Sequence, residues 1–240
     1  MTYYFALIMK IPKIACVIVN YKNFTITNEC LKSLKKLKNK CYKLNTILID
    51  NSKVNLGFAG GNNLGIKRAI RQRCDYVLLL NNDTYVTDSQ MLTKMLSLDL
   101  DIVAPILITM KNIRDYGGKL DKYFARNTHL NKPCNPDYFS GACLLIKTSV
   151  FSTTGLLDDK YFLYYEDADF CLKAKKYGFK IGLCRDTTLT HRLSASTNKL
   201  GKRKLLILSN SQLRFARKNL SPFCFPFYFS YYLYLRWKSL

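Results

Sequence analysis

Three short apolar runs, each closed by polar residues, constrain the fold of this chain more than any other feature. The runs cover residues 14–19, 46–49 and 76–80, and stretches with helical spacing separate them. A continuous apolar run rich in β-branched residues is typical of a strand buried on both faces. Alternation of such strands with helices predicts an α/β fold, a mostly parallel Rossmann-like sheet flanked by helices.

The polar residues at the strand ends are the first candidates for a functional site. Tyr21 follows the first run, Asp50 follows the second and Asp83 follows the third. An Asp in such a place is, taken alone, equally typical of a turn or a helix cap. Open α/β sheets, however, bind ligands at the carboxyl ends of their strands. We therefore expect Tyr21, Asp50 and Asp83 to lie at one edge of the sheet and to share a site.

The remainder of the sequence indicates further strands at 102–108, 139–146 and 180–183. We expect helices from Thr25 or Thr27 to 37, over 63–73, and from an acidic cluster near Glu166 to 177. The cluster also holds Asp167 and Asp169. Segment 117–136 has mixed composition and is predicted to be an irregular connection, and His191 is expected in a polar loop after the last strand.

Charge and cysteine content narrow the class of protein. The formal net charge of +22 predicts an anionic partner, which could be nucleic acid, an acidic membrane surface or a phosphorylated substrate. The basic residues are scattered along the chain, so no nucleic-acid-binding stripe is visible. Nine cysteines without a CxxC pair, together with only two histidines, favour reduced thiols in a cytoplasmic protein over disulfides or zinc.

Six short motifs, in order, make the chain similar to family 2 glycosyltransferases, in particular to their rhamnosyltransferase-like branch. The motifs are VIVNY at 17–21, IDN at 49–51, NLGFAGGNNLG at 55–65, LNNDT at 80–84, SGA at 140–142 and YYEDADFC at 164–171. The resemblance covers about residues 13–220 and implies a GT-A fold. It also implies an inverting transfer of a sugar from dTDP-rhamnose or a UDP-hexose to a saccharide acceptor, in surface polysaccharide synthesis.

The resemblance implies a role for each matching residue. Asp83 would be the main ligand of Mg²⁺ or Mn²⁺, and His191 would lie near the metal and the donor diphosphate. Asp167 would be the general base for the acceptor hydroxyl, with Glu166 in support. Asp50 would accept a hydrogen bond from the imide of uracil or thymine. The residues implied to bind the nucleotide sugar are Val19, Asn20, Tyr21, Asp50, Asn62, Asn63 and Asn82.

The C-terminal region has a composition of its own. Residues 221–235 are densely aromatic and are flanked by arginines and lysines, as suits the interface of an anionic membrane. Packing of this segment on the protein's own core or on a second subunit is the alternative. We expect an N-terminal extension at 1–12, a GT-A domain at 13–200 and a membrane-interface segment at 201–240. The protein would then be peripheral, at the cytoplasmic face of the plasma (inner) membrane, and its acceptor a lipid-linked oligosaccharide.

Two other functions remain open. Only four residues separate Asp50 from Asn55, where similar enzymes carry a helix and a strand, so a catalytically degenerate, membrane-associated homologue is an alternative. A basic nucleic-acid-binding protein is a second alternative, but it leaves the ordered acidic motifs unexplained. We therefore expect no nucleic acid among the partners. The oligomeric state is left open.

Overall fold

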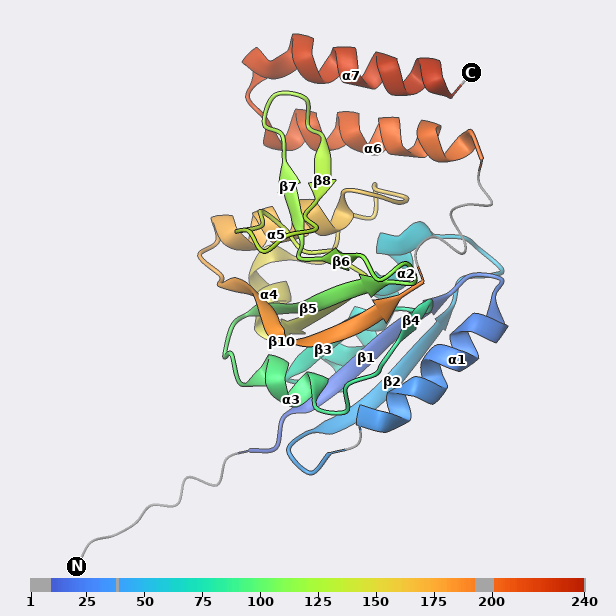
Figure 1. The fold of residues 1–240 in the computed structure, drawn as a ribbon, viewed down its shortest axis with the longest axis vertical. Helices are drawn as coiled ribbons and strands as arrows, with labels where there is room; N and C mark the ends of the chain where they lie inside the picture. Colours follow the sequence, from blue (N-terminus) through green and yellow to red (C-terminus); the bar gives the residue numbers. More distant parts are fainter. Residues whose placement is uncertain (1–9, 38, 193–200, 240) are drawn as a thin grey trace, which may run out of the picture.

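An eight-stranded sheet forms the centre of the molecule in the computed structural model (Figure 1). The structure describes residues 10–37, 39–192 and 201–239, so residues 1–9 of the expected extension lie outside it. The strand order is β2-β1-β3-β9-β5-β10-β4, and β6 pairs with β5. The strands are β1 Lys13–Asn20, β2 Lys43–Asp50, β3 Tyr76–Asn81, β4 Thr84–Tyr85, β5 Ile102–Thr109, β6 Arg114–Asp115, β9 Cys143–Lys147 and β10 Ile181–His191.

Most of the sheet is parallel, which confirms the predicted α/β fold. Strand β1 lies between β2 and β3 and is parallel to both, and β5 is parallel to β10. Strand β9 runs antiparallel to β3 and β5, and β4 runs antiparallel to the end of β10. The carboxyl ends of β1, β2 and β3 therefore meet at one edge of the sheet, where Asn20 is paired with Asp50.

Helices cover both faces of the sheet because the side chains of a strand alternate between them. Along β1, Cys16 and Ile18 pack against α1 and α3, whereas Ala15 and Val17 pack against the side of α2, α4 and α5. The helices are α1 Phe24–Leu34, α2 Gly57–Arg71, α3 Met91–Leu96, α4 Thr148–Thr154, α5 Glu166–Lys176, α6 Arg203–Asn219 and α7 Phe225–Lys238.

The helix expected over 63–73 begins earlier than predicted, because the glycine-rich stretch after β2 is itself helical. This stretch forms the first two turns of α2, which begins at Gly57 rather than at Asn63. A Cβ on Gly61 would lie 2.8 Å from a methyl of Val19, and one on Gly65 would lie 2.2 Å from a methyl of Val17. These glycines therefore allow α2 to pack closely on β1.

Segment 117–136 also differs from its prediction, because it contains a hairpin instead of an irregular connection. Strands β7 Gly118–Leu120 and β8 Asn127–His129 pair in register, with Gly118 opposite His129. Figure 1 shows the hairpin extending from the side of the central sheet past α6, with its tip at the level of α7. Strands of three residues carry no readable alternation of polar and apolar side chains, which is why the sequence did not reveal them.

Two smaller differences concern the ends of elements. The cap of α1 is Asn23, whose Oδ1 accepts a hydrogen bond from the Ile26 N–H at 3.4 Å, rather than Thr25 or Thr27. Strand β10 continues to His191, which is therefore the last residue of a strand and not part of a loop.

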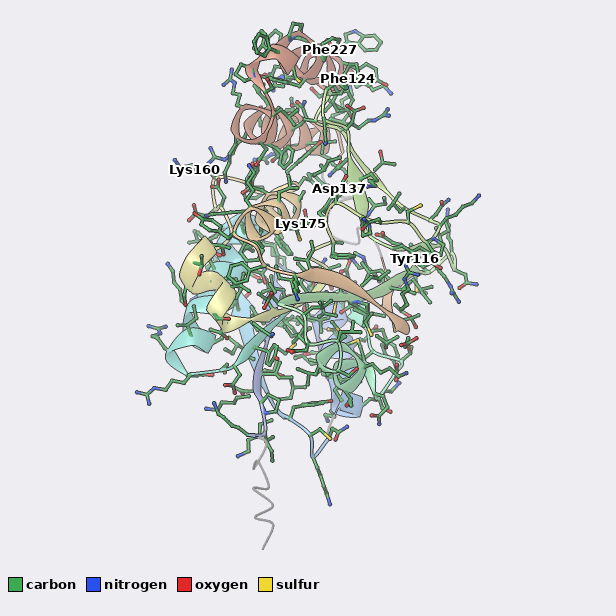
Figure 2. The ribbon with its side chains drawn as sticks, turned by 90° about the vertical axis from the view of Figure 1, so that its left-hand side faces the viewer. Tyr116, Phe124, Asp137, Lys160, Lys175 and Phe227 are labelled. Carbon is green, nitrogen blue, oxygen red and sulfur yellow. The ribbon has the colours of Figure 1, made fainter. Side chains whose placement is uncertain are left out.

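Helices α6 and α7 pack on the rest of the molecule through a third core that includes Tyr165, Phe215 and Tyr228. Figure 2 shows Phe124, at the tip of the β7–β8 hairpin, beside Phe227 of α7, and their ring centroids are 5.8 Å apart. Among the described residues, no helix is long and apolar enough to cross a membrane. All nine cysteines are free thiols, and six of them are buried.

Candidate active site

A pocket of about 360 Å³ lies where the carboxyl ends of β1 and β3 face the start of α5. Its wall combines residues from the two halves of the sheet with residues of the β7–β8 hairpin. The residues proposed from the sequence that line it are Val19, Tyr21, Asn82, Asp83, Glu166, Asp167 and His191.

Asp83 and His191 face each other in this pocket. The Oδ1 of Asp83 lies 3.2 Å from the Nε2 of His191, and the two residues are only 8% and 9% exposed. Their meeting follows from the sheet, because Thr84 of β4 pairs with His191 of β10. A backbone hydrogen bond of 2.9 Å from the Arg192 N–H to the Asp83 carbonyl fixes the same junction.

The Asp83–His191 pair fits a metal ion only if a substrate supplies further ligands. Within the described ranges, no group of three or more His, Cys, Asp or Glu side chains could hold a metal by themselves. Mg²⁺ in proteins is commonly bound by one or two carboxylates together with substrate phosphates and water. One buried carboxylate beside one imidazole matches that type of site.

The carboxylate of Asp167 is held by two backbone N–H groups. The Gly141 N–H donates to Oδ2 at 2.9 Å, and the Ala168 N–H donates to Oδ1 at 2.8 Å. Burial raises the pKa of Asp167 above its usual value, and the two hydrogen bonds offset only part of that effect. A raised pKa makes an ionised carboxylate a stronger base, as a proton acceptor requires.

Glu166 lies next to Asp167 and is 5% exposed. Its Oε2 has no hydrogen-bond partner in the part of the chain that the structure describes. Burial, and then the charge of Asp167, raise the pKa of Glu166 well above its usual value. Both effects favour the neutral form of Glu166 over the ionised form.

A strained backbone precedes these two acids. Tyr164 and Tyr165 have φ angles of 73° and 70°, in the left-handed region that non-glycine residues rarely adopt. The Tyr165 hydroxyl donates to the Ala125 carbonyl at 2.8 Å, and its ring packs 5.2 Å from that of Phe215. Such strain persists only where the surroundings hold it, and it is common at functional sites. Here it directs the first turn of α5 into the pocket.

A chain of hydrogen bonds ties the polar strand ends together. Asn20 Nδ2 donates to Asp50 Oδ1 at 3.2 Å, the Thr27 hydroxyl donates to Asn20 Oδ1 at 2.8 Å, and Asn82 Nδ2 donates to Thr27 Oγ1 at 2.9 Å. Asn20 is fully buried and acts inside this chain. Asp50 is exposed and lies outside the pocket wall, and hydrogen bonds from Ser52 and Asn20 lower its pKa.

Asn62 and Asn63 are not brought to the pocket, contrary to the expectation that they face the donor. Asn62 Nδ2 donates to the Phe58 carbonyl within α2 at 3.0 Å. Asn63 donates to the Leu157 carbonyl at 2.9 Å and accepts from the Leu157 N–H at 3.1 Å. Both side-chain amides are buried and hydrogen-bonded to backbone groups. Asn62 and Asn63 lie inside α2, which begins at Gly57, rather than in a loop before it.

Several pocket residues were not found from the sequence. Asp115, His129 and Tyr138 belong to the β6 and hairpin region, where no motif marked them. Asn51 also lines the pocket, but it belongs to the IDN motif at 49–51 and was given no role from the sequence. Its side chain bonds the Leu56 N–H at 3.1 Å and the Gly57 carbonyl at 3.0 Å, and so closes the short connection before α2.

Comparison with known proteins adds two distant relatives. No family model matches the chain. The low-salt glycan biosynthesis hexosyltransferase Agl10 of Haloferax volcanii is 29% identical over 154 residues, which are 57% of this chain and 49% of Agl10. The dTDP-rhamnosyl transferase RfbF of Shigella flexneri is 21% identical over 210 residues, which are 81% of this chain and 66% of RfbF. The chain thus spans about half of Agl10 and about two thirds of RfbF.

A solved structure shows the same fold. The mannosyltransferase PcManGT from Pyrobaculum calidifontis, in complex with GDP-Man and Mn²⁺, superposes with a TM-score of 0.59 at 11% identity. The match covers 95% of this chain and 72% of that one. At this level of identity the likeness concerns the arrangement of helices and strands alone.

Proposed function

We propose that this chain, a distant homologue of the glycosyltransferases Agl10 and RfbF with a GT-A-like fold, transfers a sugar from a nucleotide-sugar donor to a saccharide acceptor. The observation that carries the proposal is the gathering of two pairs in one pocket: Asp83 with His191, and Glu166 with Asp167. The first pair suits a diphosphate with its metal, and the second suits a hydroxyl that must lose a proton.

The donor would bind at the carboxyl ends of β1 and β3. Asp83 and His191 would hold Mg²⁺ or Mn²⁺ together with the donor diphosphate. When bound, such an ion offsets the negative charge that develops on a leaving nucleoside diphosphate. Tyr21, which is partly exposed at the pocket wall, would pack beside the base, with Val19 beneath it. The hydrogen-bonded chain through Asn20 and Asn82 would keep Asp50 in place for the base.

The acceptor hydroxyl would lose its proton to Asp167. The Gly141 N–H holds Oδ2 in place, and a protonated Glu166 would leave Asp167 as the ionised member of the pair. The acceptor oxygen would attack the anomeric carbon as the bond to the diphosphate breaks. A single displacement of this kind inverts the anomeric configuration, and Asp167 keeps the proton until it passes to solvent.

The donor we propose is dTDP-rhamnose or a UDP-hexose. The name of RfbF supports the first choice, and the name of Agl10 supports a hexose. The exposed carboxylate of Asp50 suits the imide N–H that thymine and uracil share.

The decisive experiment is donor turnover by the full chain. We would supply dTDP-rhamnose or UDP-hexoses with Mg²⁺ or Mn²⁺ and an extract of lipid-linked saccharides, and measure release of nucleoside diphosphate. The proposal expects release that depends on the metal and disappears in Asp167→Asn. If no donor gives release of nucleoside diphosphate and calorimetry detects no nucleotide binding, the result would instead support a catalytically degenerate homologue. The short connection that Asn51 closes before α2 would then be the suspected cause.

We also propose that residues 201–240 place the catalytic domain at 13–200 on an anionic membrane, at the cytoplasmic face of the plasma (inner) membrane. Phe124 at the hairpin tip packs beside Phe227 near the start of α7, and Trp237 is exposed near the end of α7. Lys122, Arg126, Arg236 and Lys238 are exposed in the same two segments, and no Asp or Glu follows Asp186. Aromatic rings with cations suit the headgroup region of such a membrane.

Vesicle binding tests this surface. The full chain should sediment with phosphatidylcholine vesicles that contain phosphatidylglycerol, and less with phosphatidylcholine alone. Replacement of Phe227 and Trp237 by Ser should weaken binding by about tenfold or more, since each ring buries substantial apolar area. Tyr177→Ser, which changes an exposed aromatic residue at the end of α5, serves as the control. Equal binding of all three proteins, or a dimer that covers α7 in solution, would overturn the membrane proposal.

A further inference from the structure

Strand β6, the β7–β8 hairpin and the segment after the hairpin line one part of the pocket with polar side chains that the proposed reaction does not use. They are Asp115, Asn127, His129 and Tyr138. None of them belongs to a motif that the sequence marked, and over the described residues none is hydrogen-bonded to Asp83 or His191.

Asp115 and His129 form a fixed pair. The Nδ1 of His129 lies 2.8 Å from the Oδ2 of Asp115, and Asp115 Oδ1 accepts the Gly117 N–H at 2.9 Å. With one nitrogen held by Asp115, the imidazole can offer its Nε2 to a ligand, and no hydrogen bond of Nε2 is found over residues 10–37, 39–192 and 201–239. A carboxylate paired with a histidine leaves little net charge, so a neutral hydroxyl suits this place better than a phosphate.

Tyr138 provides an independent sign of a missing ligand. Its side chain is 1% exposed, yet it lines the pocket and its hydroxyl has no partner among the residues that the structure describes. A buried hydroxyl without a hydrogen bond is unfavourable, so this group is expected to bond a bound molecule. The ring lies against Gly118, where a Cβ would be 2.2 Å from its Cζ, and its centroid is 6.3 Å from that of His129.

The position of these groups relative to Asp167 indicates which substrate they serve. Asp167, His129 and Tyr138 line the same pocket, and the charge of His129 acts to lower the pKa of Asp167. The donor diphosphate, in contrast, is assigned to Asp83 and His191. A hydroxyl that loses its proton to Asp167 must belong to a molecule held beside it.

From this arrangement we infer that Asp115, His129 and Tyr138 form a subsite for a neutral sugar ring of the acceptor. The inference rests on the proposed function for the role of Asp167, but the binding it predicts can be measured without any reaction. The hydroxyl of Tyr138 and the Nε2 of His129 bond two hydroxyls of the ring. Asp115 is a positioning residue that acts through His129.

The test is binding of methyl glycosides to the full chain, measured by saturation-transfer NMR. Methyl glycosides of rhamnose, glucose, galactose, mannose and N-acetylglucosamine are the probes. At least one should receive saturation on its ring protons. Tyr138→Phe, which removes a single oxygen, should weaken its binding by about tenfold, the effect of losing a hydrogen bond in a buried site. His129→Ala should weaken it less, because the His129 side chain is 57% exposed. Tyr177→Phe is the matched control and should bind as the unmodified chain does.

The outcomes separate this inference from the proposed function. No binding of any methyl glycoside, or equal binding by Tyr138→Phe, overturns the subsite. Preference for methyl glucuronide over the neutral glycosides overturns the assignment to a neutral ring. Binding of UDP and dTDP with Mn²⁺, followed by calorimetry, tests the donor site separately. If a glycoside binds in a way that depends on Tyr138 but UDP and dTDP do not bind, the subsite is retained and the proposed glycosyltransferase function is rejected.

Discussion

Asp83 and His191 meet with Oδ1 and Nε2 3.2 Å apart because the chain pairs the short strand β4 with the end of β10. Each side chain alone is an ordinary polar residue at a strand end. Together, and nearly buried, they make a place for a cation that a diphosphate can share. This junction gives the first prediction.

Asp83→Asn should weaken binding of UDP or dTDP in the presence of Mn²⁺ by about tenfold or more, since a contact to a charged group contributes roughly 1.5–3 kcal/mol. His191→Gln should have a smaller effect. Asp159→Asn changes an exposed carboxylate outside the pocket and is the control. Calorimetry with and without Mn²⁺ measures the difference. Unchanged nucleotide affinity in Asp83→Asn would remove this residue from the donor site.

Asp167→Asn should reduce kcat by roughly 10²–10⁴-fold, the usual contribution of a positioned base, while nucleotide affinity stays unchanged. The reaction needs the ionised carboxylate, so activity should fall as the pH drops through the pKa of Asp167. Because burial raises that pKa, the fall should occur above the ordinary value of about 4 for Asp. Rates of nucleoside diphosphate release from pH 4 to 8 measure both effects, and a flat profile over this range would contradict the assigned role.

Glu166→Gln should stabilise the fold increasingly as the pH rises. The pKa of Glu166 is raised in the folded chain, so the folded state binds the proton more tightly than the unfolded chain does. The stability due to this group is therefore complete below the unfolded pKa of about 4.3 and is lost as the pH rises toward the folded pKa, at up to ~1.4 kcal/mol per pH unit. A glutamine resembles the neutral acid and does not titrate, so the Glu166→Gln variant does not lose this stability as the pH rises.

Urea unfolding of the two proteins between pH 4 and 8 measures the difference in free energy of unfolding. The two curves should coincide near pH 4 and separate above it, with the variant more stable. Asp159→Asn, an exposed change, should not produce this separation. A difference that stays constant with pH would show that Glu166 does not hold a proton in the fold.

Gly57→Ala should destabilise the chain much more than Gly178→Ala. Both glycines have positive φ angles, 71° and 84°, so both changes carry the strain of a left-handed alanine, about 1–2 kcal/mol. Only at Gly57 would the new Cβ also collide, 2.1 Å from the Phe162 carbonyl oxygen, whereas nothing lies within 4 Å at Gly178. The extra cost of the collision should be about 1–3 kcal/mol or more. Equal urea midpoints for the two variants would contradict the close approach.

Much of the fold could be predicted because its strands and helix starts depend on residues that are close together in the sequence. The apolar runs before Tyr21, Asp50 and Asp83 are the parallel strands β1, β2 and β3, and the acidic cluster does begin α5. Buried strands and helix starts depend on residues that are neighbours in sequence, so patterns of a few residues reveal them. The glycines of α2 show the limit of local patterns. A glycine is as typical of a turn as of a closely packed helix, and only the strand that it packs against distinguishes the two.

By itself, the sequence determined the type of sheet and the strand-end and helix-start positions of Asp83, Glu166 and Asp167. Only the tertiary structure decided that His191 ends a strand beside Asp83 and that Asn63 bonds the backbone of Leu157. It also decided that the hairpin and the segment after it bring His129 and Tyr138 to the pocket. The physical reason is that these contacts join residues far apart in the chain. Local spacing carries no information about such contacts, which depend on strand pairing and on the space that side chains leave around one another.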